Sequence, residues 1–492
     1  MNLQMKTQTL VTSFIPVILS FCFLVTLALL PAKTVSANTI DDIYLRNGDT
    51  LTKTIFIGDT GVIKPDFTGL TDASGNAIDA SSLTVSHMID IDGDTYDWED
   101  YANDSDYMPL SLDSNGNYTA MAYGTVTVLI RAYLPSTSSY SYYGDDGDYS
   151  YGTNYVFSAS CTFDITIDTS AISLMETNAT IYAASAYLAD VYCYGQAEIH
   201  FDNSYSLNDW IVPTSFKYTN QKKISLYCSL TDNVLSIEVT AKTTQPIQST
   251  VLTYTIADKA FEIPLTIRCL SINKRGLTAP KGSKYTLKIK GSDLETEWTS
   301  SNPKIVSVSK NGTIKLRKKG NAVITATIGD FKFGCAVSSV SGKMMKVIKF
   351  GTYMGKHWKY SQAKRMKKGY YDCSSLVYKA YLKGGKKICN ATGYAPVAAD
   401  IAKWYTSHGK VLANSYRHSQ VNRMVFLPGD LAFRTGAKNG RYKGIYHVEM
   451  FTGYSVAYYN SKGKPYLNER WAVRPEGYYG SGLLMIRPFK NF

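Results

Sequence analysis

Short runs of alternating apolar and polar residues fill the chain from residue 38 to residue 341, separated by glycine, asparagine, aspartate and serine. Residues 125–130 (TVTVLI) are an example. Alternation over about four to eight residues predicts strands that bury one face, and regularly spaced turn residues predict β-sandwiches. We therefore expect Ig-like sandwiches over residues 38–168 and 169–268, and a further β-module over residues 269–341.

The third module has the most specific pattern, with WTSSNP at residues 298–303, IVSV at 305–308, NGTI at 311–314 and GNAVITA at 320–326. The pair Asn311-Gly312 predicts a tight hairpin turn. The side chains expected to fill one core are Val306, Val308, Ile314, Val323 and the ring of Trp298. These runs resemble the bacterial Ig-like group 2 module, and the resemblance implies a spacing or adhesion role that involves no chemistry.

The periodicity changes to that of a helix after Cys373. Apolar residues recur there at helical spacing, at Leu376, Val377, Ala380 and Tyr381. The glycines at 384–385 predict the end of this helix. A cysteine at a helix N-terminus is favoured as the anionic thiolate, which is the nucleophilic form. The alternative is an inert core cysteine or a disulfide with Cys389.

Two strands with turn signals follow downstream. Residues 427–433 (LPGDLAF) predict a turn that leads into a strand, and residues 445–454 (IYHVEMFTGY) predict a second strand that carries His447. A cysteine nucleophile and its histidine base are brought together by the fold rather than by sequence proximity. Cys373 and His447 are therefore the candidate catalytic pair.

The motifs DCSSLVY, PGDLAF and HVEMFTGY resemble the NlpC-type cell-wall peptidases, a papain-like family of secreted bacterial cysteine endopeptidases, over residues 344–492. The resemblance implies an α+β papain-like domain after the all-β modules. It also implies hydrolysis of peptidoglycan stem peptides, commonly between a γ-linked D-glutamate and the following diamino acid. Carried over by position, Cys373 would be the nucleophile and His447 the general base. Tyr360 would lie near the oxyanion site with the backbone amide of Cys373, and Asp372 and Ser374 would belong to the oxyanion or substrate-binding region.

The chain departs from this family at the third catalytic position. The family places a second polar residue after the catalytic histidine, on the next strand, to orient the imidazole. No histidine follows His447, so Asn460 is the candidate, with Asn468 as the alternative. A glycine that the family usually has after the cysteine is Ser375 here, which is a change between two small residues.

Metal and cofactor chemistry has little support in the sequence. The histidines of the C-terminal region are scattered, at positions 357, 408, 418 and 447, without the close ligand pairs that zinc requires. Residues 90–94 (DIDGD) only loosely resemble a calcium loop, because the glycine comes too early for an EF-hand. We therefore expect no metal and no other cofactor in catalysis.

An apolar run over residues 11–30 follows Lys6 and precedes Val35-Ser36-Ala37, a small-residue cleavage pattern. Residues 1–37 are thus predicted to be a signal peptide, with an uncleaved membrane anchor as the alternative. The expected location is secreted or on the cell surface. Seven of the eight cysteines follow this leader, an odd number, and we interpret those other than Cys373 as small core residues rather than a disulfide framework.

Charge is divided along the 492-residue chain, which has a net charge of +12. Residues 1–268 hold 12 Lys and Arg against 30 Asp and Glu, whereas residues 269–492 hold 40 against 10. A basic C-terminal half favours binding to anionic cell-wall polymers. Nucleic acid is not an expected partner, because an exported protein seldom meets it and no nucleic-acid-binding motif is present.

The sequence leaves functional alternatives open. A secreted peptidoglycan endopeptidase is the main hypothesis; the others are an adhesin or scaffold whose papain-like domain binds without cleaving, and an N-acetylmuramoyl-L-alanine amidase of related fold. Residues 136–154, rich in Tyr, Ser, Gly and Asp, lie between two predicted strands and are expected to form a long, solvated hairpin loop. Its tyrosines could instead contact a surface glycan or a protein ligand.

Overall fold

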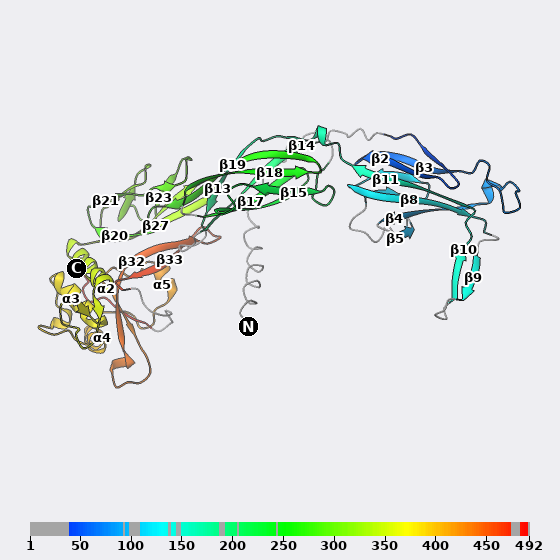
Figure 1. Ribbon diagram of the computed structural model, residues 1–492. Coiled ribbons are helices and arrows are strands. Elements are labelled where there is room, and N and C mark those ends of the chain that lie inside the picture. Colours follow the sequence, from blue (N-terminus) through cyan, green and yellow to red (C-terminus); the bar gives the residue numbers. More distant parts are fainter. Residues whose placement is uncertain are drawn as a thin grey trace. The chain divides into compact units, whose positions relative to one another are not determined.

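The computed structural model describes residues 39–91, 94–97, 109–135, 139–143, 149–185, 192–203, 206–242, 245–473 and 483–490 (Figure 1). These residues divide into two compact units: one runs to Ile172 and includes Asp202–Val212, and the other comprises Ser173–Phe201 and Pro213–Phe492. The predicted signal peptide lies outside the described residues, as do residues 92–93 of the calcium-like loop.

The first unit consists of two sheets. One has the strand order β1 (Ile43–Arg46), β3 (Thr60–Asp66), β7 (Asn117–Ala120), β6 (Leu110–Leu112). The other has the order β2 (Thr50–Phe56), β11 (Phe157–Thr166), β8 (Gly124–Tyr133), β4 (Thr84–Ile91), β5 (Asp94–Asp97). Every second side chain of β8 is buried, and the ring of Tyr118 on β7 packs against Phe163 on β11 with centroids 4.7 Å apart. The predicted β-sandwich is therefore confirmed here.

The segment between β8 and β11 contains strands of its own. Strands β9 (Ser139–Tyr143) and β10 (Tyr149–Thr153) pair as an antiparallel hairpin. The flanking strands β8 and β11 pair antiparallel, so the predicted hairpin connection is confirmed, but it is not a loop throughout, because part of it forms β9 and β10. Tyrosine and threonine favour strands, and the alternation of tyrosine with serine in this segment suits a hairpin.

The next module is a single nine-stranded sheet. Its strands are β12 (Ser173–Leu174), β13 (Ala179–Ala184), β14 (Tyr192–Asp202), β15 (Thr214–Tyr218), β16 (Ile224–Thr231), β17 (Val234–Lys242), β18 (Ile247–Ile256), β19 (Lys259–Ile272) and β22 (Ile289–Lys290). The main path is β15-β18-β19-β13-β14-β17-β16, with β12 beside β14 and β22 beside β19. Strand β17 contacts β19 although two strands separate them in this order, so the sheet curls around its own core.

A disulfide joins Cys193 on β14 to Cys269 on β19. Strand β13 lies between these two strands, with Ala184 opposite Tyr194 and Ala183 opposite Cys269, and the two cysteine Cα atoms are 6.0 Å apart. The expectation that the cysteines do not form disulfides was wrong for this pair, because 76 residues separate its members and only the sheet order brings them together.

The other cysteines in the described part of the chain keep their thiols. Cys161, Cys228 and Cys335 lie in cores, as predicted. Cys373 and Cys389 keep thiols that are partly exposed, so they do not form the disulfide that was considered as an alternative.

The third β-module packs two small sheets together. One sheet has the order β20 (Gly276–Pro280), β27 (Phe331–Val340), β26 (Gly320–Ile328), β23 (Glu297–Ser300), and the other has the order β21 (Lys284–Thr286), β25 (Thr313–Leu316), β24 (Val306–Val308). Strands β24 and β25 form the expected hairpin, and Gly312 supports its turn with a φ of +71° that favours glycine. Four of the five predicted core residues, Trp298, Val306, Val308 and Ile314, contribute to this core.

The C-terminal region has an α+β architecture. Its helices are α2 (Gly342–His357), α3 (Cys373–Lys383), α4 (Ala398–Ser407) and α5 (His418–Asn422). Its sheet has the order β30 (Val411–Ala413), β34 (Leu484–Ile486), β31 (Leu431–Arg434), β32 (His447–Tyr459), β33 (Pro465–Trp471), and β28 (Lys359–Tyr360) pairs separately with β29 (Tyr370–Tyr371). Helix α3 packs on α2 and on β32. No helix within the described ranges is long and apolar enough to cross a membrane.

The third β-module and the C-terminal region share a hydrophobic core, and Figure 1 shows β20 and β27 alongside β32. Val323 and Ala336 pack there with Phe451, Tyr454 and Val456 of β32. Val323 therefore does not fill the core of its own module as predicted, because β26 buries side chains on both of its faces.

Polar contacts reinforce this shared core. The amide of Val456 donates to the carbonyl of Arg275 at 2.9 Å, and the Arg275 guanidinium donates to the carbonyl of Ala457 at 2.8 Å. Thr278 Oγ1 donates to the carbonyl of Thr452 at 2.7 Å. The third module is thus fixed directly to the strand that begins at His447.

Substitution of Gly276 tests whether this junction is closely packed. A Cβ atom there would lie 2.3 Å from the carbonyl oxygen of Tyr454, so Gly276→Ala should lower the free energy of unfolding by about 1–3 kcal/mol. Gly342→Ala is the matched control, because a Cβ atom at Gly342 meets nothing within 4 Å. Urea denaturation of both variants measures the effect, and equal stability of the two would contradict a close-packed junction.

Candidate functional site

Helix α3 begins at Cys373 as the sequence predicts. Asp372 is its N-cap: the Ser375 amide donates to Asp372 Oδ1 at 2.7 Å, and the Asp372 amide donates to Ser375 Oγ at 2.9 Å. Such a capping box satisfies two amides that a helix start otherwise leaves unpaired. The cysteine thus occupies the first helical position, and its side chain is partly exposed.

A cavity of about 480 Å³ opens beside this helix start. It is lined by residues from α3, β28, β29, β31 and β32 and from the segment after β33: Tyr360, Tyr371, Cys373, Leu376, Arg434, Tyr446, His447, Val448, Glu449, Met450, Ala472 and Val473. The fold therefore brings Cys373, Tyr360 and His447 to one cavity, although 87 positions separate Tyr360 from His447.

His447 Nε2 lies 3.3 Å from Glu449 Oε1, and His447 lines the same cavity as Cys373. Burial alone would lower the pKa of His447, but its polar interactions with Cys373 and Glu449 raise it to about 9. The imidazole is therefore protonated at neutral pH.

Glu449 is the polar neighbour of the imidazole. Its Oε1 lies 3.3 Å from His447 Nε2, and the same oxygen lies 3.1 Å from Arg434 Nη2. The Glu449 side chain is only 6 % exposed, so the contact with His447 is screened little by water.

The sequence reasoning missed Glu449, although a signal was present. His447 and Glu449 are two positions apart in a predicted strand, and such residues point to the same face. The resemblance to the NlpC-type family instead indicates a residue on the strand that follows His447.

Asn460 and Asn468 do not reach His447. Asn460 lies in the turn after β32, where its Oδ1 accepts hydrogen bonds from the amides of Lys462 at 3.1 Å and Lys464 at 2.9 Å. Asn468 is exposed on β33 opposite Ser455. The strand continues for twelve residues beyond His447, about 40 Å, so its turn is far from the cavity. Neither asparagine can orient this imidazole, and that expectation is corrected.

Tyr360 lies where the resemblance places it. It lines the cavity together with Cys373, and its ring meets Tyr371 edge-on with centroids 5.6 Å apart. Burial and the neighbouring charges of Cys373 and Asp372 raise the pKa of Tyr360, so the phenol stays protonated at neutral pH. A protonated phenol beside the Cys373 amide gives the cavity two possible donors next to the sulfur.

Asp372 and Ser374 contact Arg365 and are not among the residues that line the cavity. Arg365 Nε lies 3.2 Å from Asp372 Oδ2, and Arg365 Nη2 donates to Ser374 Oγ at 2.9 Å and to the carbonyl of Ala395 at 2.9 Å. Both residues are buried and do not line the cavity. The expectation that they contact substrate is therefore corrected: they fix the start of α3.

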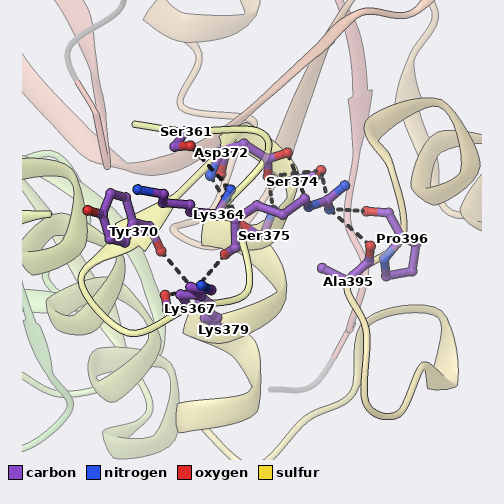
Figure 2. A network of polar contacts seen from close by, with 11 residues as sticks. Ser361, Lys364, Lys367, Tyr370, Asp372, Ser374, Ser375, Lys379, Ala395 and Pro396 are labelled. Carbon is purple, nitrogen blue, oxygen red and sulfur yellow. Dashed lines mark hydrogen bonds and ion pairs between the residues drawn. The ribbon is translucent and has the colours of Figure 1, made fainter. Parts of the chain in front are cut away.

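Lys379 fixes the loop that follows Tyr360, between β28 and β29. Its ammonium donates to the carbonyls of Arg365 at 2.7 Å, Lys367 at 3.1 Å and Tyr370 at 2.8 Å, as Figure 2 shows. Burial lowers the pKa of Lys379. The negative charge of Asp372 opposes this shift, whereas the positive charge of Arg365 adds to it. Since Lys379 lies on α3, the segment between β28 and β29 is tied to the helix that begins at Cys373.

Metal-binding geometry is not found among the described residues, where no three His, Cys, Asp or Glu side chains cluster to hold an ion. The other C-terminal histidines pack against aromatic rings. His408 stacks on Trp404 with centroids 3.8 Å apart, and His418 stacks on Tyr466 at 4.3 Å.

Comparison with known proteins identifies one segment. Residues 281–337 match the family of bacterial Ig-like domains (group 2), which confirms the resemblance of the third β-module. No curated protein matches the chain.

Several solved structures are similar to parts of the chain. Invasin, a bacterial integrin-binding protein, is 14 % identical, with 55 % of this chain and 54 % of that chain covered and a TM-score of 0.27. An I-band fragment of titin is 9 % identical over 52 % and 88 % of the two chains, with a TM-score of 0.20. A xylanase from termite gut with a bacterial Ig-like domain is 20 % identical over 17 % and 24 %, with a TM-score of 0.13. The chain thus spans about half the length of invasin.

Replacing Glu449 tests the electrostatics of the site. Glu449→Gln removes a negative charge beside the imidazole and should lower the pKa of His447 by about one unit or more. The exposed Glu297→Gln on β23 is the control and should leave it unchanged. NMR titration of the imidazole measures both, and an unchanged pKa in Glu449→Gln would contradict the contact.

The same titration predicts a pH dependence of stability. The pKa of His447 in the folded protein, about 9, exceeds the ordinary value of 6.5. Its contribution to stability is therefore complete below pH 6.5 and is lost as the pH rises through about 9. Glu449→Gln should reduce this loss between pH 6.5 and 9.

Proposed function

We propose that the protein is a secreted cysteine peptidase of the NlpC type that hydrolyses stem-peptide amides of peptidoglycan. The observation that carries the proposal is the convergence of Cys373, His447 and Glu449 on one cavity at a helix start. The resemblance of residues 344–492 to NlpC-type peptidases supports the reaction class.

The proposed reaction has two steps. The Cys373 thiolate attacks the carbonyl carbon of the amide and forms a C–S bond, and protonated His447 gives its proton to the leaving nitrogen as the C–N bond breaks. His447 then takes a proton from water, which attacks the thioester carbonyl. The C–S bond breaks, the acid product leaves, and the thiolate and the imidazolium are restored.

Three further residues have proposed roles in this cycle. Glu449, held by Arg434, orients the imidazole and stabilises its protonated form. The Cys373 amide and the Tyr360 hydroxyl are positioned to stabilise the oxyanion.

The charge of the chain supports binding to an anionic polymer. Residues 269–492 carry 40 Lys and Arg against 10 Asp and Glu, and this excess attracts the basic half to anionic cell-wall polymers. We also propose that the protein is located at the cell surface. The basic charge of residues 269–492 and the apolar N-terminal run both support this location. The first two β-modules are proposed to hold the peptidase away from the surface or to bind a surface glycan or protein.

Removal of the thiol tests this function. The purified chain should release fragments from peptidoglycan sacculi, and Cys373→Ala should abolish release because no nucleophile remains. Cys389→Ala is the control, since Cys389 does not line the cavity and burial raises its pKa to about 12. Full activity of Cys373→Ala would contradict the proposal.

Mass spectrometry of the released fragments separates the related activities. An endopeptidase leaves part of the stem peptide on the glycan, whereas an amidase frees the intact stem peptide from it. Binding to sacculi without any release, in the chain with an intact Cys373, would instead indicate a non-catalytic adhesin or scaffold.

A further inference from the structure

A second, larger groove lies between the third β-module and the C-terminal region, with a volume of about 720 Å³. Strands β23, β26 and β27 form one side, and α5 with the β32–β33 turn forms the other. It shares no lining residue with the cavity at Cys373. The two sites lie toward opposite ends of β32, since His447 begins the strand and Tyr459 ends it.

The groove is lined mainly by uncharged hydrogen-bonding side chains. They are Thr299, Ser300, Ser301, Asn302, Asn321, Thr325, Thr327, Asn422 and Tyr459. Hydroxyl and amide groups both donate and accept, which suits a ligand that itself carries many hydroxyl or amide groups. A cleft for an apolar ligand would instead have mostly aliphatic walls.

The charged lining residues are Lys332 and Arg423, and both are exposed. None of the described residues that line the groove carries a carboxylate. Lys332 Nζ comes within 3.0 Å of the position that a Cβ atom would occupy at Gly463 in the β32–β33 turn, so the cation lies across the groove from its own strand. Lys462 and Lys464 flank that glycine. The charge of the groove therefore selects anionic ligands.

The floor of the groove is fixed before any ligand arrives. Asn321 Nδ2 donates to the carbonyls of Met424 at 3.1 Å and Phe426 at 2.8 Å, and the hydroxyls of Thr325 and Tyr459 are 2.8 Å apart. These contacts join the two sides of the groove. A preorganised site loses less conformational entropy on binding than one that must form around its ligand.

We propose that this groove binds a segment of an anionic, hydroxyl-rich polymer. Glycan strands that carry carboxylates and polymers of polyol phosphate share this chemistry. Because the groove lies about 40 Å along β32 from His447, bound polymer leaves the cavity open. Binding at a second site raises the effective concentration of linked substrate at the first. The proposal goes beyond the peptidase function and does not require Cys373 to be reactive.

Binding to the full chain carrying Cys373→Ala tests the groove without hydrolysis. Calorimetry with two probes, glycan strands stripped of their peptides and a purified polyol-phosphate polymer, distinguishes the two sources. Lys332→Glu should weaken binding of the preferred probe at least about tenfold, since it places a carboxylate beside an anion. Lys315→Glu on β25 is the matched control, because it makes the same change of charge on an exposed strand outside the groove.

A second variant separates the groove from general charge attraction. Thr327→Trp fills the groove without changing charge and should weaken binding to a similar extent, with unfolding curves showing that the variant is folded. Equal losses in Lys332→Glu and Lys315→Glu would overturn the proposal in favour of non-specific attraction. Undiminished binding in Thr327→Trp, or binding of neither probe by the parent chain, would overturn it as well.

Discussion

The burial of strand β32 is the constraint on which the C-terminal half depends. Most of its thirteen residues are buried, from Val448 to Tyr454 without interruption. A strand with two faces needs a partner on each, and β32 packs against helix α3 and against β20 and β27 of the Ig-like module. The strand cannot shift without breaking one of these cores. His447 and Glu449 at its start are therefore held in register with Cys373.

This arrangement gives the Ig-like module a structural role in the domain that follows it. The group 2 resemblance implies a spacer, whereas here the module completes the core of the domain that follows it. Gly276 and Gly334 allow its strands to approach Tyr454, Val456 and Tyr459, because a Cβ atom at either glycine would overlap them. The module and the α+β domain thus share a core that supports the site, and the groove between them is formed by the same contact.

Local patterns explain what could be predicted from the sequence. Alternating strands, the Asn311-Gly312 turn and the helix that starts at Cys373 follow from residues close together in the chain, and all are present. The Cys193–Cys269 disulfide, the role of Val323 and the orientation of Asp372 toward Arg365 depend on which elements become neighbours. The role of Glu449 could be predicted in part. Strand periodicity places Glu449 on the same face as His447, but only the fold shows that Asn460 lies far from His447.

The proposed function depends on a single reactive thiol, and stoichiometric alkylation tests that most directly. Iodoacetamide near neutral pH should modify Cys373 and spare Cys389, whose pKa burial raises to about 12. Hydrolysis of stem peptides should then fall in proportion to the fraction of Cys373 that is modified, measured by peptide mass spectrometry. Undiminished hydrolysis by protein with fully alkylated Cys373 would contradict the account, as would equal labelling of the two cysteines.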